Sequence, residues 1–179
     1  MNKTILITRP QPDANNYADE LLSLGFTPIV EPMLTLTPIT FTLPPPDTFT
    51  QILATSANAL LPLKNTLDLL QKPIICVGQH TATTAKKIGF TTITNINGIG
   101  ADILTHILTS PSLRSEKFLH VCGAHLAFPL VEKLCENGIT AHTLTVYRTE
   151  KIHAFSPALI DAIRQHSITG ITFFSTRTA

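Results

Sequence analysis

The chain has 179 residues, of which 44% are hydrophobic and 14% are charged, and its formal net charge is +1. This composition predicts a globular protein of one domain or two small ones and excludes a disordered chain. A charge this low excludes the basic field that nucleic-acid binding requires, and no apolar run reaches membrane-spanning length. The apolar run Ile5–Ile7 is too short for the core of a signal peptide. We therefore expect a cytoplasmic protein without a nucleic-acid or membrane partner.

The cysteines and histidines give no sign of a metal site. Cys76, Cys122 and Cys135 are odd in number and lack CxxC spacing, and the seven histidines lack the spacing of metal ligands. The three cysteines are predicted to be buried thiols in a reducing compartment, and neither disulfides nor metal ligands.

The first elements form a strand–helix–strand unit. A β-branched run at 4–8 is followed by helical spacing over 13–24, by Gly25, and by extended residues 26–30. Such a unit is the building block of a parallel sheet. Residues 33–43 then alternate Thr with apolar residues and end in a triple proline, which indicates an extended crossing out of this first lobe.

Strands and helices alternate through the middle of the chain, which predicts an α/β lobe with a mostly parallel sheet. The predicted strands are 51–56, 72–78, 91–95 and 117–123, and the predicted helices begin at about 57 and span 81–88, 101–108 and roughly 126–136.

A strand at 142–149 is expected to carry the chain back, antiparallel to the outward crossing. Tyr147 lies on its polar phase, opposite Leu144 and Val146, so its phenol is expected to face water or a cleft, where it can give a proton. The alternative is a tyrosine that packs its ring and keeps only its hydroxyl in water. A helix over 156–166 and a strand over 168–174 complete the pattern.

The two halves of the chain resemble each other. In both copies, at Ile5 and at Phe118, twenty residues separate the start of a strand from a glycine that ends the next helix, and a Ser closes the strands that end at Ser56 and Ser175. The first copy continues past Ser56 with further elements, whereas the second stops soon after Ser175. The repeat therefore predicts roughly 40 to 60 residues more than the chain contains, beginning with a helix after Ser175.

Hydroxyl or small residues follow several predicted strands. Because ligands gather at the carboxyl ends of parallel strands, where helices present unused N–H groups, these residues suit carboxylate or phosphate oxygens. The alternative is that the hydroxyls only cap helices. The positions are Thr8-Arg9, Thr55-Ser56, Gly78 to Thr81, Cys122-Gly123 and Ser175. Motifs of serine hydrolases, nucleotide-binding loops and zinc proteases are missing.

Taken together, the chain resembles the uroporphyrinogen-III synthase (HemD) family. The resemblance runs through the whole chain in order, although each motif alone is loose. It is carried by Ile5–Pro10, Ala54-Thr-Ser-Ala-Asn58, Val77-Gly-Gln-His-Thr-Ala-Thr-Thr-Ala85, Gly100–Leu104, Gly123, Leu130–Gly138, Val146-Tyr-Arg-Thr149 and Ile171-Thr-Phe-Phe-Ser175.

The resemblance implies two similar α/β lobes with mostly parallel sheets, joined by a two-stranded antiparallel linker, with the active site in the cleft between the lobes. The first lobe would comprise 1–35 plus 153–179 and the second 44–141, with 36–43 and 142–152 as linker strands. The C-terminal part of the first lobe is expected to be missing. The family needs no metal or cofactor, and a monomer is expected.

The implied reaction converts hydroxymethylbilane to uroporphyrinogen III with loss of water and inversion of the terminal pyrrole ring, through a spiro intermediate. Tyr147 matches the family's tyrosine and would help the hydroxyl to leave. The residues expected to bind the substrate's acetate and propionate groups are Arg9, Thr55, Ser56, Thr81, Gly123 and Ser175. The competing hypothesis is a two-lobed anion-binding protein without catalysis, including an inactive shortened remnant of the enzyme.

Overall fold

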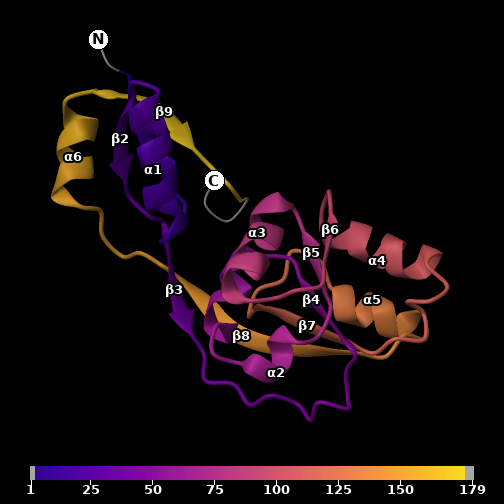
Figure 1. Ribbon diagram of the computed structural model, residues 1–179. Coiled ribbons are helices and arrows are strands. Elements are labelled where there is room, and N and C mark those ends of the chain that lie inside the picture. Colours follow the sequence, from indigo (N-terminus) through magenta and orange to yellow (C-terminus); the bar gives the residue numbers. More distant parts are fainter. Residues whose placement is uncertain (1–2, 176–179) are drawn as a thin grey trace. The chain divides into compact units, whose positions relative to one another are not determined.

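The computed structural model describes residues 3–175. By their contacts these residues form two compact units, one of 3–37 with 149–175 and one of Pro38–Arg148. Most of the elements are labelled in Figure 1. The strands are β1 (Thr4–Ile7), β2 (Thr27–Val30), β3 (Leu34–Pro38), β4 (Gln51–Ala54), β5 (Ile74–Val77), β6 (Ile93–Ile96), β7 (Phe118–Gly123), β8 (Ala141–Lys151) and β9 (Ile168–Thr172). The helices are α1 (Asp13–Ser23), α2 (Leu67–Leu70), α3 (Gln79–Ile88), α4 (Gly100–Thr109), α5 (Leu130–Glu136) and α6 (Pro157–Arg164), with short 3₁₀ turns η1 (Ala57–Ala59) and η2 (Leu61–Leu63). The helix expected after Ser175 lies outside the described residues.

The unit that contains both ends of the chain has a three-stranded parallel sheet in the order β2-β1-β9. Helix α1 packs on this sheet through a cluster formed by Ile7, Ala14, Ala18 and Leu21. Helix α6 is capped by Ser156, whose hydroxyl accepts a hydrogen bond from the Leu159 N–H.

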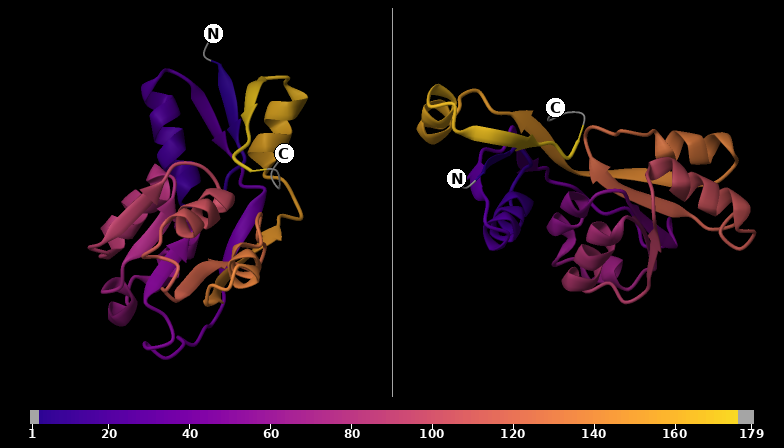
Figure 2. Two further views of the ribbon diagram at one scale, coloured as in Figure 1. Left: turned by 90° about the vertical axis from the view of Figure 1, so that its right-hand side faces the viewer. Right: turned by 90° about the horizontal axis from the view of Figure 1, so that it is seen from above.

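The 38–148 unit contains most of a six-stranded sheet in the order β3-β8-β7-β4-β5-β6. Every neighbouring pair from β8 to β6 is parallel. Two apolar clusters cover its two faces. One contains side chains of α3, α2 and the 3₁₀ turns, and the other contains side chains of α4 and α5. The two views of Figure 2 show these helices on the two sides of the sheet. The result is the mixed α/β architecture with parallel sheets that the sequence predicted.

Strands β3 and β8 lie next to each other at the edge of this sheet. The Ile39 N–H donates to the Val146 carbonyl, and the Ile152 N–H donates to the Met33 carbonyl. Because the partners' numbers run in opposite directions, the pairing is antiparallel, as expected for the two crossings.

The repeat has a structural counterpart at two glycines. Gly25 follows α1 with φ +81° and Gly138 follows α5 with φ +76°. In both places the next residue donates its N–H to a carbonyl five residues earlier, at Leu21 and at Leu134, over 3.0 Å. In this kind of helix ending the residue after the helix has a left-handed backbone conformation with φ > 0, which glycine adopts at little cost.

Prolines account for two wrong helix predictions. The helix expected from about residue 57 is instead a pair of 3₁₀ turns, because Pro62 has no N–H to donate within a longer helix. The helix expected from roughly residue 126 begins at Leu130, directly after Pro129. A proline disfavours helical backbone in the residue before it, so Phe128 stays outside the helix.

The centre of the 38–148 sheet should dominate the stability of this unit. Ile52 is fully buried in β4, between β5 and β7. We predict that Ile52→Ala lowers the free energy of unfolding by about 2–5 kcal/mol, measured by urea denaturation. The control Ile171→Ala removes the same atoms from a side chain that is 50% exposed, so an equal loss there would contradict this assignment of the core.

Candidate functional site

The candidate site lies along the carboxyl edge of the 38–148 sheet. Strands β8, β7, β4 and β5 are consecutive and parallel, so their carboxyl ends share this edge. Four of the seven residues predicted from sequence lie at or just beyond these ends, and a fifth, Tyr147, lies within β8 where its pairing with β7 stops. The four are Thr55, Ser56, Thr81 and Gly123.

Gly123 and Tyr147 are brought together by a shift in the β7–β8 register. Cys122 pairs with Thr145 but Gly123 pairs with Tyr147, which leaves Val146 as the extra residue. A Cβ on Gly123 would lie 2.5 Å from Tyr147 Cζ, 2.8 Å from Cε2 and 2.9 Å from Oη. The tyrosine ring therefore occupies the space that any side chain at position 123 would need.

This shift corrects the predicted orientation of Tyr147. Strict alternation places its ring on the face opposite Leu144 and Val146. The structure instead packs the half-buried ring against the cluster that contains both of these residues. The extra residue breaks the alternation of faces, so Tyr147 lies on the face that strict alternation would give to its neighbour.

Thr55 lies directly after β4 and is half-buried. Its Oγ1 is 3.4 Å from Nε2 of His120, which is 1% exposed within β7. The other ring nitrogen of His120, Nδ1, is buried and has no hydrogen-bond partner among residues 3–175. Burial lowers the pKa of His120 from 6.5 to about 4, so the ring is neutral at physiological pH.

Sequence reasoning missed His120, because the histidines were considered only as metal ligands. A usable signal was present: the strand Phe118–Gly123 is otherwise apolar, and a single histidine interrupts it. A buried polar group of this kind needs a partner, which directs attention to neighbouring strands.

Ser56 and Thr81 differ in what their hydroxyls do. Ser56 Oγ accepts a hydrogen bond of 3.3 Å from the Asn58 N–H and caps η1, as the simpler interpretation expects. Thr81 is not a cap. It is the third residue of α3, is 5% exposed, and its hydroxyl has no hydrogen-bond partner within the described part of the chain.

Helix α3 follows Gly78, its N-cap at φ +78°, and so has no side-chain cap. The N–H groups in the first turn of a helix have no acceptor within it, and together with the helix dipole they favour an anion. An uncapped ten-residue helix at the end of β5 therefore complements the Thr81 hydroxyl.

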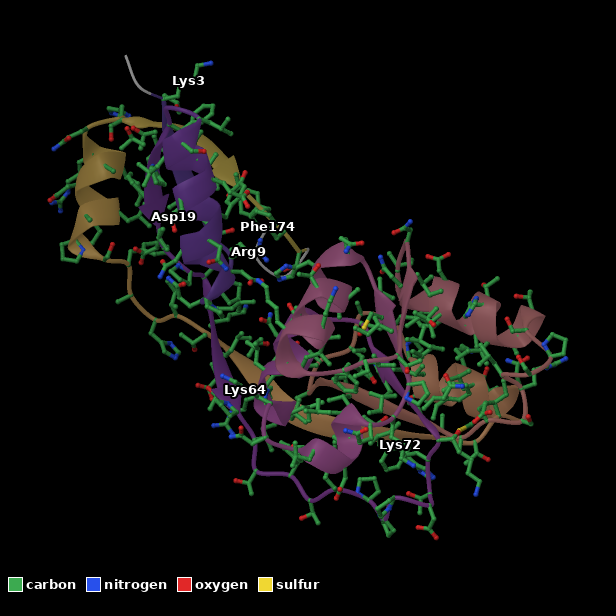
Figure 3. The ribbon with its side chains drawn as sticks, in the orientation of Figure 1. Lys3, Arg9, Asp19, Lys64, Lys72 and Phe174 are labelled. Atoms are coloured by element: carbon green, nitrogen blue, oxygen red, sulfur yellow. The ribbon has the colours of Figure 1, made fainter. Side chains whose placement is uncertain are left out.

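The other two predicted residues belong to the terminal unit. Arg9 follows β1, and its Nη2 is 2.6 Å from Asp13 Oδ2. Its guanidinium also lies over the ring of Phe174, 4.3 Å from the centroid, and Figure 3 shows these two side chains together. Ser175 is exposed and lies three residues after the end of β9. The charge of Arg9 is thus already compensated by Asp13.

The cysteines are free, and two of them are buried as predicted, but Cys135 is exposed. Its helix α5 buries Leu130 and Leu134 on the face toward the sheet, so the adjacent position faces outward. Burial raises the pKa of Cys76 to about 12 and that of Cys122 to about 11. These two thiols therefore stay protonated and are poor nucleophiles.

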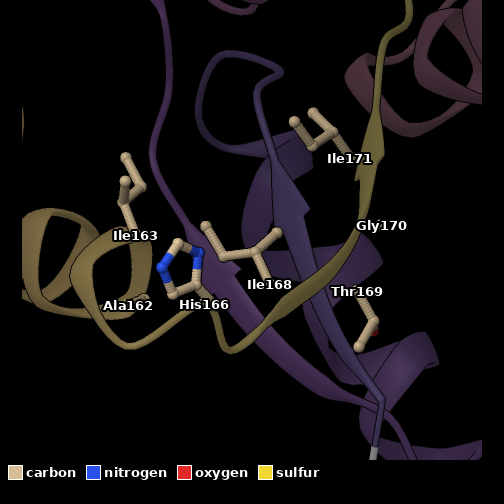
Figure 4. A pocket seen from close by; sticks show the side chains of 7 residues that line it. All are labelled: Ala162, Ile163, His166, Ile168, Thr169, Gly170 and Ile171. Atoms are coloured by element: carbon tan, nitrogen blue, oxygen red, sulfur yellow. The ribbon is translucent and has the colours of Figure 1, made fainter.

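An open groove of about 360 Å³ lies between α6 and β9, as Figure 4 shows. It is lined by Ala162, Ile163, His166, Ile168, Thr169, Gly170 and Ile171, and it contains none of the predicted site residues. Within residues 3–175 no group of three or more His, Cys, Asp or Glu side chains could hold a metal ion. In the same range, no helix has both the length and the apolar character needed to cross a membrane.

The close approach of Gly123 and Tyr147 gives a test of the geometry. Gly123→Ala forces the tyrosine ring to move and should destabilise the chain by about 1–3 kcal/mol, as overpacking does. In a Tyr147→Ala background the added methyl group meets no ring, so the same change should cost much less. Urea denaturation of the four proteins gives both values, and an equal cost in both backgrounds would contradict the contact.

The buried His120 ring makes stability depend on pH. Its pKa is about 4 in the folded chain and about 6.5 when exposed, so between these values the unfolded state binds the additional proton. Stability should fall as pH drops from 6.5 to 4, by up to about 1.4 kcal/mol per pH unit from this group. The slope of the unfolding free energy against pH should therefore be steeper for the wild type than for His120→Gln in this window. Parallel pH profiles would rule out a buried neutral imidazole.

Comparison with solved structures gives two informative similarities. A mutant uroporphyrinogen III synthase from the extremely thermophilic bacterium Thermus thermophilus matches with a TM-score of 0.60 and 16% identity, over 98% of this chain and 74% of that one. Uroporphyrinogen-III synthetase from Helicobacter pylori matches with a TM-score of 0.56 and 19% identity, over 90% of this chain and 68% of that one. At these identities the similarities establish the fold.

A comparison with curated proteins found no significant match. The family model described as uroporphyrinogen-III synthase HemD, however, matches residues 15–179 and so includes β4, β5, β7, β8 and the residues at their carboxyl ends. The chain therefore belongs to the uroporphyrinogen-III synthase family.

Proposed function

We propose that this chain cyclises hydroxymethylbilane to uroporphyrinogen III, with loss of water and inversion of the terminal pyrrole ring. The family to which it belongs consists of lyases of tetrapyrrole and haem biosynthesis. The observation that carries the proposal for this chain is the position of Tyr147. Its ring lies against Gly123 at the carboxyl edge of a parallel sheet, beside strand ends that present hydroxyls.

In this proposal Tyr147 assists departure of the hydroxyl group. A hydroxymethylpyrrole loses hydroxide slowly but loses water readily once the oxygen receives a proton or a strong hydrogen bond. The pyrrole nitrogen stabilises the azafulvenium cation that remains. The bond that breaks is carbon–oxygen, and the phenol supplies its proton, or a hydrogen bond, to the leaving oxygen.

The remainder of the task is orientation. The cation must be attacked by the substituted carbon of the terminal ring, which gives the spiro intermediate, and not by its free carbon. Holding these two atoms in contact is proximity catalysis, which needs binding groups and no further acid or base. No metal or cofactor has a role in this mechanism.

The binding groups proposed for the substrate's carboxylates are neutral donors. Thr55 and Thr81 offer hydroxyls, Ser56 and Gly123 lie beside them, and the uncapped first turn of α3 offers N–H groups. A net charge of +1 gives the chain little overall attraction for an anion. Arg9 and Ser175 are proposed as further, weaker contributors. The guanidinium of Arg9 already forms an ion pair with Asp13.

The wider proposal is a cytoplasmic monomer that binds this small molecule and neither nucleic acid nor membrane. Near-neutral charge and free cysteines support it. The proposed lobes are 1–35 with 153–179, and 44–141, with 36–43 and 142–152 as linkers. A non-catalytic anion-binding protein is not favoured, because such a protein has no need for the phenol that the glycine at 123 accommodates.

The direct test supplies hydroxymethylbilane to the purified chain and separates the uroporphyrinogen isomers. We expect isomer III. The spontaneous product, isomer I, would be the sole product of an inactive chain and would contradict the proposed function.

The role of Tyr147 is tested in the same assay. Tyr147→Phe keeps the ring that packs against Gly123 and removes the phenol oxygen, so the rate of isomer III formation should fall at least several-fold with the fold intact. The chain has one other tyrosine, Tyr17, whose ring packs edge-on against Phe174. Tyr17→Phe is therefore a matched control and should retain the wild-type rate. An unchanged rate in Tyr147→Phe would remove this residue from the mechanism.

A further inference from the structure

His120 is a buried polar group that the proposed mechanism does not use. It is 1% exposed in a strand whose other residues are all buried. Its backbone pairs with Leu53, two residues before Thr55, so the sheet itself holds the two side chains near each other. The only partner of its ring within residues 3–175 is Thr55 Oγ1, at 3.4 Å from Nε2.

The neutral ring carries its proton on one of two nitrogens. With the proton on Nδ1, a buried N–H would lack an acceptor, because Nδ1 has no partner in the described part of the chain. With the proton on Nε2, the unpartnered nitrogen is only an acceptor, and the N–H has Thr55 as its partner. Orphaned buried N–H groups are rarer than under-satisfied acceptors, so the second tautomer is favoured.

The tautomer decides what Thr55 can offer a ligand. A hydroxyl has one proton to donate and two lone pairs, and a carboxylate can only accept. If Nε2–H donates to a lone pair of Thr55, the threonine proton stays available for a carboxylate. If Nε2 were unprotonated, it would take that proton, and Thr55 would present its lone pairs to an anion.

We propose that His120 is a positioning residue that donates from Nε2 to Thr55 and so fixes the Thr55 hydroxyl as a donor to a substrate carboxylate. This inference rests on the proposed function, because it takes the carboxylates of the tetrapyrrole as the ligand of Thr55. His120 itself touches no substrate. Its side chain is buried and acts through the threonine.

The tautomer is measured on the wild-type protein, without substrate. Selective ¹⁵N labelling of the histidines and NMR at neutral pH distinguish Nε2–H from Nδ1–H through ring nitrogen shifts and couplings. We expect the Nε2–H form for His120. The Nδ1–H form would overturn the proposal, whatever the activity of the chain.

The consequence for binding is measured with uroporphyrin III, a stable tetrapyrrole that carries the product's carboxylates. His120→Leu removes the donor and should weaken binding about 10-fold, the effect of one hydrogen bond to a charged group. His120→Gln retains an N–H donor and should bind nearly as tightly as the wild type. The same changes should appear in KM for hydroxymethylbilane, while kcat changes less than about 2-fold.

Further variants separate positioning from a purely structural role. Thr55→Val should weaken binding as much as His120→Leu, and the double variant no more than either alone. His142→Leu alters an exposed histidine of the neighbouring strand β8 and should bind like the wild type. Additive losses, or a Gln variant as weak as the Leu variant, would overturn the proposal.

The experiments distinguish failure of the proposed function from failure of the role proposed for His120. A wild type that yields only isomer I but shows the Nε2–H tautomer and the predicted series of uroporphyrin affinities would refute the catalytic proposal and leave the role of His120 standing. A wild type that does not bind uroporphyrin III would overturn the role of Thr55 as a carboxylate donor, and with it that of His120.

Discussion

The carboxyl edge of the 38–148 sheet depends on the absence of a side chain at Gly123. A single added carbon would lie 2.5 Å from the Tyr147 ring, far inside van der Waals contact. The register shift between β7 and β8 places the ring at this spot, and the glycine leaves room for it. The phenol is held at the strand ends by the sheet itself, and no loop is needed to position it.

In the proposed function, neutral donors at this edge bind a ligand that must later be released as product. Ionic pairing with buried cations would hold the carboxylates tightly, whereas single hydroxyls and helix N–H groups bind an anion more weakly and with defined direction. The arrangement at Arg9 fits the same view. Its guanidinium is paired with Asp13 at 2.6 Å and stacked on Phe174, so it resembles a structural element more than a free anion receptor.

Most of the fold could be predicted from local patterns. Apolar strands alternating with helices predicted the parallel sheets. The glycines at 25 and 138 predicted the repeat, and both have a positive φ and the same hydrogen bond at the end of their helix. Both wrong helix boundaries arose where a proline, Pro62 or Pro129, was given too little weight. The candidate site was harder. Its strand-end hydroxyls were predictable from topology, but the orientation of Tyr147 depends on one extra residue in β8 that pairing alone reveals. His120 stands out in its apolar strand, but its partner could not be predicted, because Thr55 is 65 residues away in sequence and is near only because β4 and β7 are neighbours.

Proton donation by the Tyr147 phenol during loss of the hydroxyl group is the central step of the proposed reaction. The most direct measurement replaces this tyrosine alone with fluorinated tyrosines of progressively lower phenol pKa and records the pH–rate profile for isomer III formation. The ring and its contact with Gly123 are kept, and only the acidity of the donor changes. If the phenol is the donor, the alkaline limb of the profile moves to lower pH in step with the phenol pKa. An alkaline limb that stays fixed across the series would contradict this role of the phenol.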